Sequence, residues 1–185
     1  LGMEVVIIVA KLIFAGLFMF ILMRYYGLSI GGAFLSGIAF IFSGGLRGEH
    51  LFYWGFGSFL WLPLVIYFLE RSVQSNKNTS LFIVSAGITI GFAFLGGHIQ
   101  TILHFSLAVF LWGFARIILN RSSDANFLNQ VKSVAISLLL TYGLGLAISA
   151  VSLLPVLELY LLDGFSRTYD FGLWFNQLFQ NLTKI

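Results

Sequence analysis

The sequence predicts an all-α membrane protein, a polytopic bundle of about six transmembrane helices. Hydrophobic residues make up 59% of the 185-residue chain and charged residues only 9%, far below the roughly 25% charged residues of a soluble domain. The mean hydropathy is +0.97. The apolar residues also fall into runs close to the roughly 20 residues that an α-helix needs to cross a hydrocarbon core. These three observations predict that the chain lies in a lipid bilayer.

Hydropathy divides the chain into spans separated by polar or glycine-containing loops. The predicted spans are residues 5–23, 30–44, 52–69, 81–95, 102–119 and 134–157. Pro63 and Pro155 fall inside the third and sixth spans, where each removes a backbone hydrogen bond and is expected to kink its helix. We therefore expect a bundle over residues 1–160. Residues 161–185 are expected to form an amphipathic segment in the outer interface, at the start of a further region of a longer protein.

The basic residues predict how the bundle is oriented. Six of the ten lie in alternate loops: Arg24, Arg71, Lys77, Arg116, Arg121 and Lys132. The positive-inside rule places these loops in the cytoplasm and the remaining loops on the outer face. The net charge of +3 gives no argument for a nucleic-acid partner. Because the chain has no cysteine, disulfides and thiolate metal sites are excluded.

Lys11 is an ionisable residue inside the first predicted span, where a charge costs roughly 2.5 to 3.5 kcal/mol on insertion scales. It follows Glu4 by seven residues, so it lies about 10 Å deeper along a helix. One interpretation is that its ammonium snorkels outward toward Glu4 or the head groups. The other is that the ammonium faces a lipid phosphate inside the bundle.

A polar hinge at residues 96–101 separates the fourth and fifth spans on the predicted outer face. Gly97 frees the backbone to approach a substrate, and His98 can donate a hydrogen bond to, or accept one from, a hydroxyl or phosphate. Gln100 and His104 are four residues apart and share a helix face, which predicts that they line a cavity. The alternative is a helix cap with interhelical hydrogen bonds.

Two more polar pairs lie on the same predicted face. Glu49 and His50 are adjacent in the second loop and form a candidate carboxylate and imidazole pair. Glu158 ends the last span, and the guanidinium of Arg167 is suited to pair with it or to bind a phosphate. A solvated loop and structural pairing are the alternatives. No cofactor is predicted, and a divalent metal held by Glu49, His50, His98 and Glu158 is an alternative that their spacing does not indicate.

Three motifs of the chain resemble those of the bacterial YfhO-like membrane proteins. Gly97-His98-Ile99-Gln100 is similar to their Gly-His-Pro-Gln motif, with Ile99 in place of the proline. Leu153-Leu154-Pro155 through Glu158, followed by Ser166-Arg167, resembles their Leu-Leu-Pro-Thr-Leu-Glu-Leu segment and its trailing Ser-Arg. Leu62-Pro63 through Glu70-Arg71 is similar to their Leu-Pro and Glu-Arg helix. The order of the motifs matches over most of the chain.

This resemblance implies a GT-C type glycosyltransferase module in the bacterial plasma membrane. The implied donor is a polyprenyl-phosphate sugar, and the implied acceptor on the outer face is lipoteichoic acid or another cell-wall polymer. Members of this type place a catalytic aspartate in their first outer loop, and the chain has no such loop, so the fragment is expected to lack the catalytic base.

Within this function, the sequence predicts Glu49 and His98 as catalytic residues. The predicted substrate-binding residues are Lys11, His50, Gly97, Gln100, His104, Glu158 and Arg167. Two other classes stay open on the residues alone. One is a transporter or flippase of lipid-linked or small solutes, with Lys11 and His104 lining a path. The other is a non-catalytic membrane scaffold, in which every polar residue is a packing contact.

Overall fold

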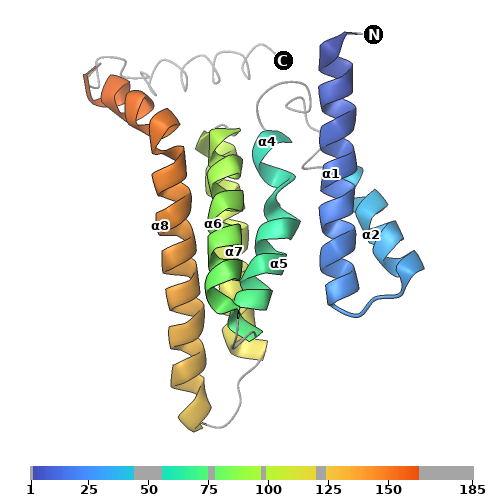
Figure 1. Ribbon diagram of the computed structural model, residues 1–185, viewed down its shortest axis with the longest axis vertical. Coiled ribbons are helices and arrows are strands. Elements are labelled where there is room, and N and C mark those ends of the chain that lie inside the picture. Colours follow the sequence, from blue (N-terminus) through green and yellow to red (C-terminus); the bar gives the residue numbers. More distant parts are fainter. Residues whose placement is uncertain (1, 44–55, 75–77, 97–98, 120–123, 163–185) are drawn as a thin grey trace, which may run out of the picture. The chain divides into compact units, whose positions relative to one another are not determined.

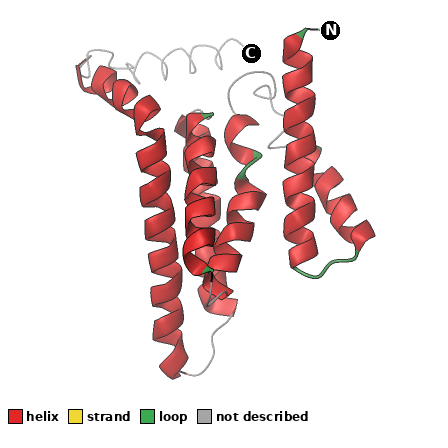
Figure 2. Ribbon diagram, in the orientation of Figure 1, coloured by secondary structure: helices red, strands yellow, loops and turns green. Residues whose placement is uncertain are grey.

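A computed structural model describes residues 2–43, 56–74, 78–96, 99–119 and 124–162 of the chain. All regular secondary structure in these ranges is helical, without a strand (Figures 1 and 2). The predicted all-α class is therefore confirmed for the described residues. The chain divides into two compact units, Leu1–Ser149 and Ala150–Ile185. The helix packing described below is that of the first unit.

The described residues form seven helices. They are α1 (Met3–Tyr25), α2 (Ile30–Ile41), α4 (Phe56–Phe59), α5 (Leu62–Gln74), α6 (Thr79–Leu95), α7 (Ile99–Leu119) and α8 (Asp124–Leu162). Helix α8 begins in the first unit and continues into the second. Of the predicted outer segment at residues 161–185, only the last two residues of α8 are described, and the rest lies outside the described residues.

Three helices of the described chain are long and apolar enough to cross a membrane, which indicates a membrane protein. Their apolar stretches are Val5–Tyr25, Thr101–Ile118 and Phe127–Pro155. The predicted count of six spans is not reproduced, because the other apolar helices are shorter. Helix α6 has 17 residues and α2 has 12, and 12 residues cover about 18 Å of a hydrocarbon core of about 30 Å.

The third predicted span is interrupted rather than kinked. A turn at Leu60 and Trp61 separates α4 from α5. The backbone N–H of Val65 donates to the carbonyl oxygen of Trp61 at 3.0 Å, which closes the first turn of α5. Pro63 lies in that first turn, where its missing N–H has no helical partner to lose. Hydropathy did not detect this break because both sides of it are apolar. Pro155 lies inside α8, as predicted.

Helices α1 and α2 form a closely packed hairpin. Gly27 adopts φ +87° in the connecting turn, a conformation that side-chain-bearing residues rarely adopt. The side chain of Ser29 caps α2 by accepting a hydrogen bond from the N–H of Gly32 at 3.2 Å. Gly37 is buried, and a Cβ atom there would lie 2.8 Å from the carbonyl oxygen of Gly16. The two backbones therefore touch, as small residues permit in lipid.

Helices α6 and α8 mesh in a similar way, with glycines of one helix facing large residues of the other. A Cβ atom on Gly87 would lie 2.7 Å from a methyl group of Leu144. On α8, a Cβ atom on Gly145 would lie 2.5 Å from a methyl group of Ile90, which is fully buried. In contrast, many large apolar side chains of α1, α2, α7 and α8 are exposed, as expected for helices that face lipid.

We expect Gly37→Leu to destabilise the α1 and α2 hairpin by about 1 to 3 kcal/mol, because the added side chain overpacks the contact with Gly16. Gly31→Leu is the matched control, since a Cβ atom at Gly31 meets nothing within 4 Å. Unfolding in mixed micelles with increasing sodium dodecyl sulfate gives the free energy of unfolding of both variants. Equal losses of stability in the two variants would contradict the close backbone contact.

Candidate functional site

The described residues include part of the site predicted from the sequence. Five of the predicted residues lie outside them, namely Glu49, His50, Gly97, His98 and Arg167. Gln100 is placed in the first turn of α7. Within the described part of the chain, no group of three His, Asp or Glu residues could hold a metal ion. The alternative metal site was expected mainly at residues outside that part, so it stays untested.

His104 and Glu158 lie among the described residues, on α7 and α8. His104 is exposed on α7 and is not among the residues that line the pocket around Lys11. Glu158 is exposed on α8, in the second unit of the chain. The roles predicted for these two side chains therefore stay predictions.

Lys11 lines a pocket of about 290 Å³, which we call the Lys11 pocket. Helix α1 contributes one wall, and α4, the turn that follows it and α6 contribute the rest. The lining residues are Lys11, Phe14, Phe18, Gly57, Leu60, Trp61, Phe92 and Gly96. Lys11 is partly buried, and its ammonium is the charged group of this lining. The pocket thus combines one positive charge with mostly aromatic and aliphatic walls.

The aromatic lining of the Lys11 pocket is a continuous stack of rings from α1 to α6. The ring centroids of Phe14 and Phe18 are 5.9 Å apart, and those of Phe18 and Trp61 are 5.5 Å apart. Trp61 in turn stacks on Phe92 at 5.5 Å, with an angle of 20° between the ring planes. Offset stacking of this kind is favourable and gives each ring a defined orientation. The stack therefore forms an ordered apolar wall beside Lys11.

The glycine-rich end of α6 forms part of the same pocket. A Cβ atom on Gly57 would collide with the carbonyl group of Gly96, so the backbones of α4 and α6 touch at this point. The buried hydroxyl of Ser58 donates to the carbonyl oxygen of Ala93 at 2.6 Å and ties the same two helices together. The sequence predicted Lys11 and the hinge that begins at Gly96 as separate features. In the structure they meet in one pocket.

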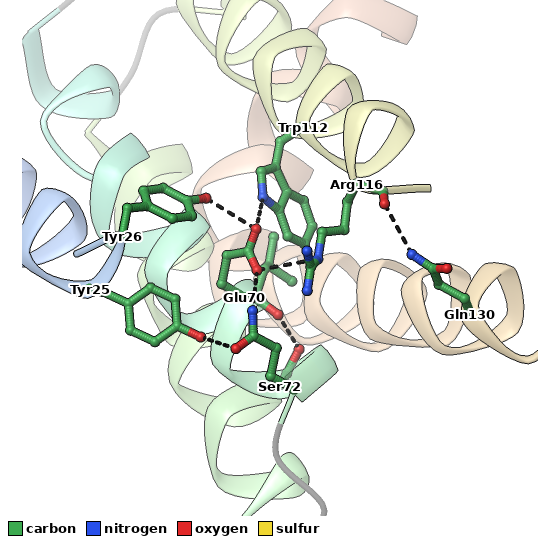
Figure 3. A network of polar contacts seen from close by, with 9 residues as sticks. Tyr25, Tyr26, Glu70, Ser72, Trp112, Arg116 and Gln130 are labelled. Carbon is green, nitrogen blue, oxygen red and sulfur yellow. Dashed lines mark hydrogen bonds and ion pairs between the residues drawn. The ribbon is translucent and has the colours of Figure 1, made fainter. Parts of the chain in front are cut away.

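A second polar site surrounds Glu70 on α5 (Figure 3). The side chain of Glu70 is buried, and the residue is only 3% exposed. One carboxylate oxygen accepts hydrogen bonds from the hydroxyl of Tyr26 at 3.1 Å and from the indole N–H of Trp112 at 2.9 Å. The other accepts from the amide of Gln74 at 3.1 Å and forms an ion pair with Arg116 Nε at 3.3 Å. Both oxygens are therefore paired.

Further contacts extend this arrangement to four helices. The hydroxyl of Tyr25 donates to the amide oxygen of Gln74 at 2.7 Å. The side-chain amide of Gln130 on α8 donates to the backbone carbonyl of Arg116 at 3.0 Å. The guanidinium of Arg71 lies over the Tyr25 ring, 6.0 Å from its centroid. We call Tyr25, Tyr26, Glu70, Gln74, Trp112 and Arg116 the Glu70 cluster (Figure 3).

In the sequence, Glu70 belongs only to a family-like motif, and this cluster was not predicted. Two local signals point to it. Glu70 is a carboxylate directly after an apolar stretch, and an unpaired buried charge is costly. Trp112 and Arg116 are four residues apart and so share one face of α7. The sequence does not show which helix packs against this face of α7.

No protein-family model, curated protein or solved structure matches the chain. The resemblance to the YfhO-like proteins therefore stays a prediction from the three motifs, and the site is interpreted from its own geometry.

We expect Glu70→Met to lower the free energy of unfolding by about 3 to 5 kcal/mol, because the Arg116 guanidinium is left without its buried partner. Glu70→Met combined with Arg116→Met should recover part of this loss, since no uncompensated charge is then buried. Unfolding in sodium dodecyl sulfate of the two single variants and the double variant measures the coupling. Purely additive losses would show that the ion pair does not contribute.

We expect Tyr26 to ionise late in an alkaline titration. Partial burial, together with the negative charge of Glu70 and the hydrogen bond to it, raises the pKa of Tyr26 to about 12 from its ordinary 10.0. Because the pKa of Tyr26 is higher in the folded protein, the stability that its neutral phenol contributes is complete below pH 10. This stability is lost as the pH rises through 12. The difference in phenolate absorbance between the wild type and Tyr26→Phe, followed as the pH rises, measures the pKa of Tyr26. A difference between them that titrates near pH 10 would contradict the assignment.

Proposed function

We propose that this chain belongs to a membrane glycosyltransferase that moves a sugar from a polyprenyl-phosphate donor to a cell-envelope acceptor such as lipoteichoic acid. The observation that carries the proposal is the Lys11 pocket, in which a single ammonium lies beside an apolar aromatic wall. A lipid phosphate has the matching chemistry, because an anionic group joins an apolar chain to a sugar. The proposed location is the plasma membrane of a bacterium.

The chemistry asked of the Lys11 pocket is electrostatic. The acceptor hydroxyl attacks the anomeric carbon, the bond between this carbon and the phosphate oxygen breaks, and the lipid phosphate leaves with the bonding electrons. A carboxylate accepts the hydroxyl proton. A cation fixed beside the leaving phosphate, in a pocket with mostly apolar walls, stabilises the charge that develops there. We assign this role to Lys11 and keep Glu49 and His98 as proposed partners in the chemistry.

The distribution of basic residues supports placing the Lys11 pocket on the outer side. Arg71 and Arg116 lie at the Glu70 cluster, where α1, α5 and α7 end, and Arg24 lies in the last turn of α1. The Lys11 pocket includes Gly96, at the opposite end of α6 from the loop that follows α5. The positive-inside rule then puts the Glu70 cluster near the cytoplasm.

We expect Lys11→Met to lower kcat/KM for sugar transfer by about 10² to 10³, the loss typical of removing one group that stabilises developing charge. The assay uses the intact protein in nanodiscs with a panel of polyprenyl-phosphate sugars. His98→Ala is also expected to lower transfer. Lys132→Met is the control, because Lys132 is exposed on α8 and is not part of the pocket lining.

The assay separates the proposed function from its alternatives. Transfer that depends on the donor and is lost in Lys11→Met, but not in Lys132→Met, supports the proposal. If no sugar donor is turned over or bound, the glycosyltransferase assignment is wrong. If transfer occurs equally in the wild type and in Lys11→Met, the assignment of the phosphate to Lys11 is wrong.

A further inference from the structure

We propose that the Glu70 cluster is a positioning device for the Lys11 pocket. Tyr25 and Tyr26 anchor the end of α1, and Lys11 lies on the same helix about 21 Å away at 1.5 Å per residue. The anchor holds α1 in the one register that brings Lys11 beside Gly96. Only the identity of the ligand in the Lys11 pocket rests on the proposed function; the positioning role does not.

Near Lys11, the contacts that hold α1 against the rest of the bundle are apolar. Ala15 is fully buried against Leu60, and Phe18 stacks on Trp61. Stacking orients the rings, but in lipid the hydrophobic effect does not drive one helix against another. Polar bonds elsewhere on α1 therefore add directional contacts to this packing.

The hydrogen bonds of the Glu70 cluster do define a register. Tyr25 donates to Gln74 and Tyr26 donates to Glu70, so two consecutive residues of one helix end are bound to α5. Both bonds depend steeply on distance and angle. A slip of one residue moves a helix by about 1.5 Å and turns it by about 100°, which would break both bonds and turn Lys11 away from the pocket.

Glu70, which accepts the hydrogen bond from Tyr26, is also bound by α7. The carboxylate of Glu70 is bound by Trp112 and Arg116 of α7, so it does not depend on α1 for its position. Removing the tyrosine hydroxyls would remove these two polar bonds of α1 while leaving the buried ion pair of α5 and α7 in place. This separates a positioning effect from a general loss of stability.

The test uses Tyr25→Phe combined with Tyr26→Phe, which removes two hydroxyl groups and keeps both rings. Ser72→Ala is the matched control, because the Ser72 hydroxyl donates to the carbonyl oxygen of Leu69 within α5 and connects no two helices. The single variant Tyr26→Phe keeps one anchor and serves if the double variant does not fold. All variants are made in the intact protein, reconstituted in nanodiscs.

The register of α1 is measured by cross-linking. The chain has no cysteine, so Lys11→Cys and Gly96→Cys introduce the pair of thiols to be measured. A side chain fits at Gly96, where the nearest atoms to an added Cβ lie at 3.5 Å. With a short bifunctional methanethiosulfonate, we expect the cross-linked yield to fall about fivefold in the double Phe variant and to stay unchanged with Ser72→Ala.

Ligand binding gives a second readout, with Lys11 in place and geranylgeranyl phosphate as the probe. We expect its Kd to rise about tenfold in the double Phe variant and to stay constant in Ser72→Ala. If the wild type does not bind the probe, the proposed ligand is wrong, and cross-linking still decides the positioning role. An unchanged cross-linked yield in the folded double Phe variant, or in Tyr26→Phe where only this variant folds, would overturn the positioning role.

Discussion

The buried carboxylate of Glu70 is the constraint on which the arrangement of α1, α5 and α7 depends. A charge taken out of water costs several kcal/mol unless it is paired and hydrogen-bonded. Glu70 meets this requirement with the guanidinium of Arg116 and with donors that include Tyr26 and Trp112. With Glu70 on α5, Tyr26 at the end of α1 and the other two partners on α7, three segments must come close together here. One local electrostatic requirement therefore sets the relation of three helices.

Close backbone contact at glycine is the second principle of the fold, and it acts away from the Glu70 cluster. Helices α1 and α2 touch at Gly16 and Gly37, and α4 and α6 touch at Gly57 and Gly96. Without a hydrophobic driving force in lipid, such contacts allow the dense packing that holds helices together. At the α4 and α6 contact, the missing side chains leave room beside the ring of Trp61. The same glycines thus hold the helices together and form part of the Lys11 pocket.

The Lys11 pocket and the Glu70 cluster divide two tasks between the two halves of α1. In the proposed function, Lys11 offers a charge to a ligand in an apolar setting, and the described pocket lining holds no carboxylate that would neutralise its ammonium. Glu70 has its charge satisfied internally, which makes it a support and not a reactive group. A rigid helix connects the two, so polar bonds at one end of α1 set the geometry at the other.

The length and composition of the apolar runs determined that the chain is helical and that α1, α7 and α8 are long enough to cross a membrane. They also marked Lys11, since a charge inside an apolar run is conspicuous in one dimension. Hydropathy failed at Trp61, because averaging over a window hides a turn whose flanks are both apolar. Only the tertiary structure decided that Lys11 and Gly96 line one pocket and that Glu70 pairs with Arg116. Hydropathy is a property of neighbours in sequence, whereas these pairings depend on which faces of distant helices come into contact.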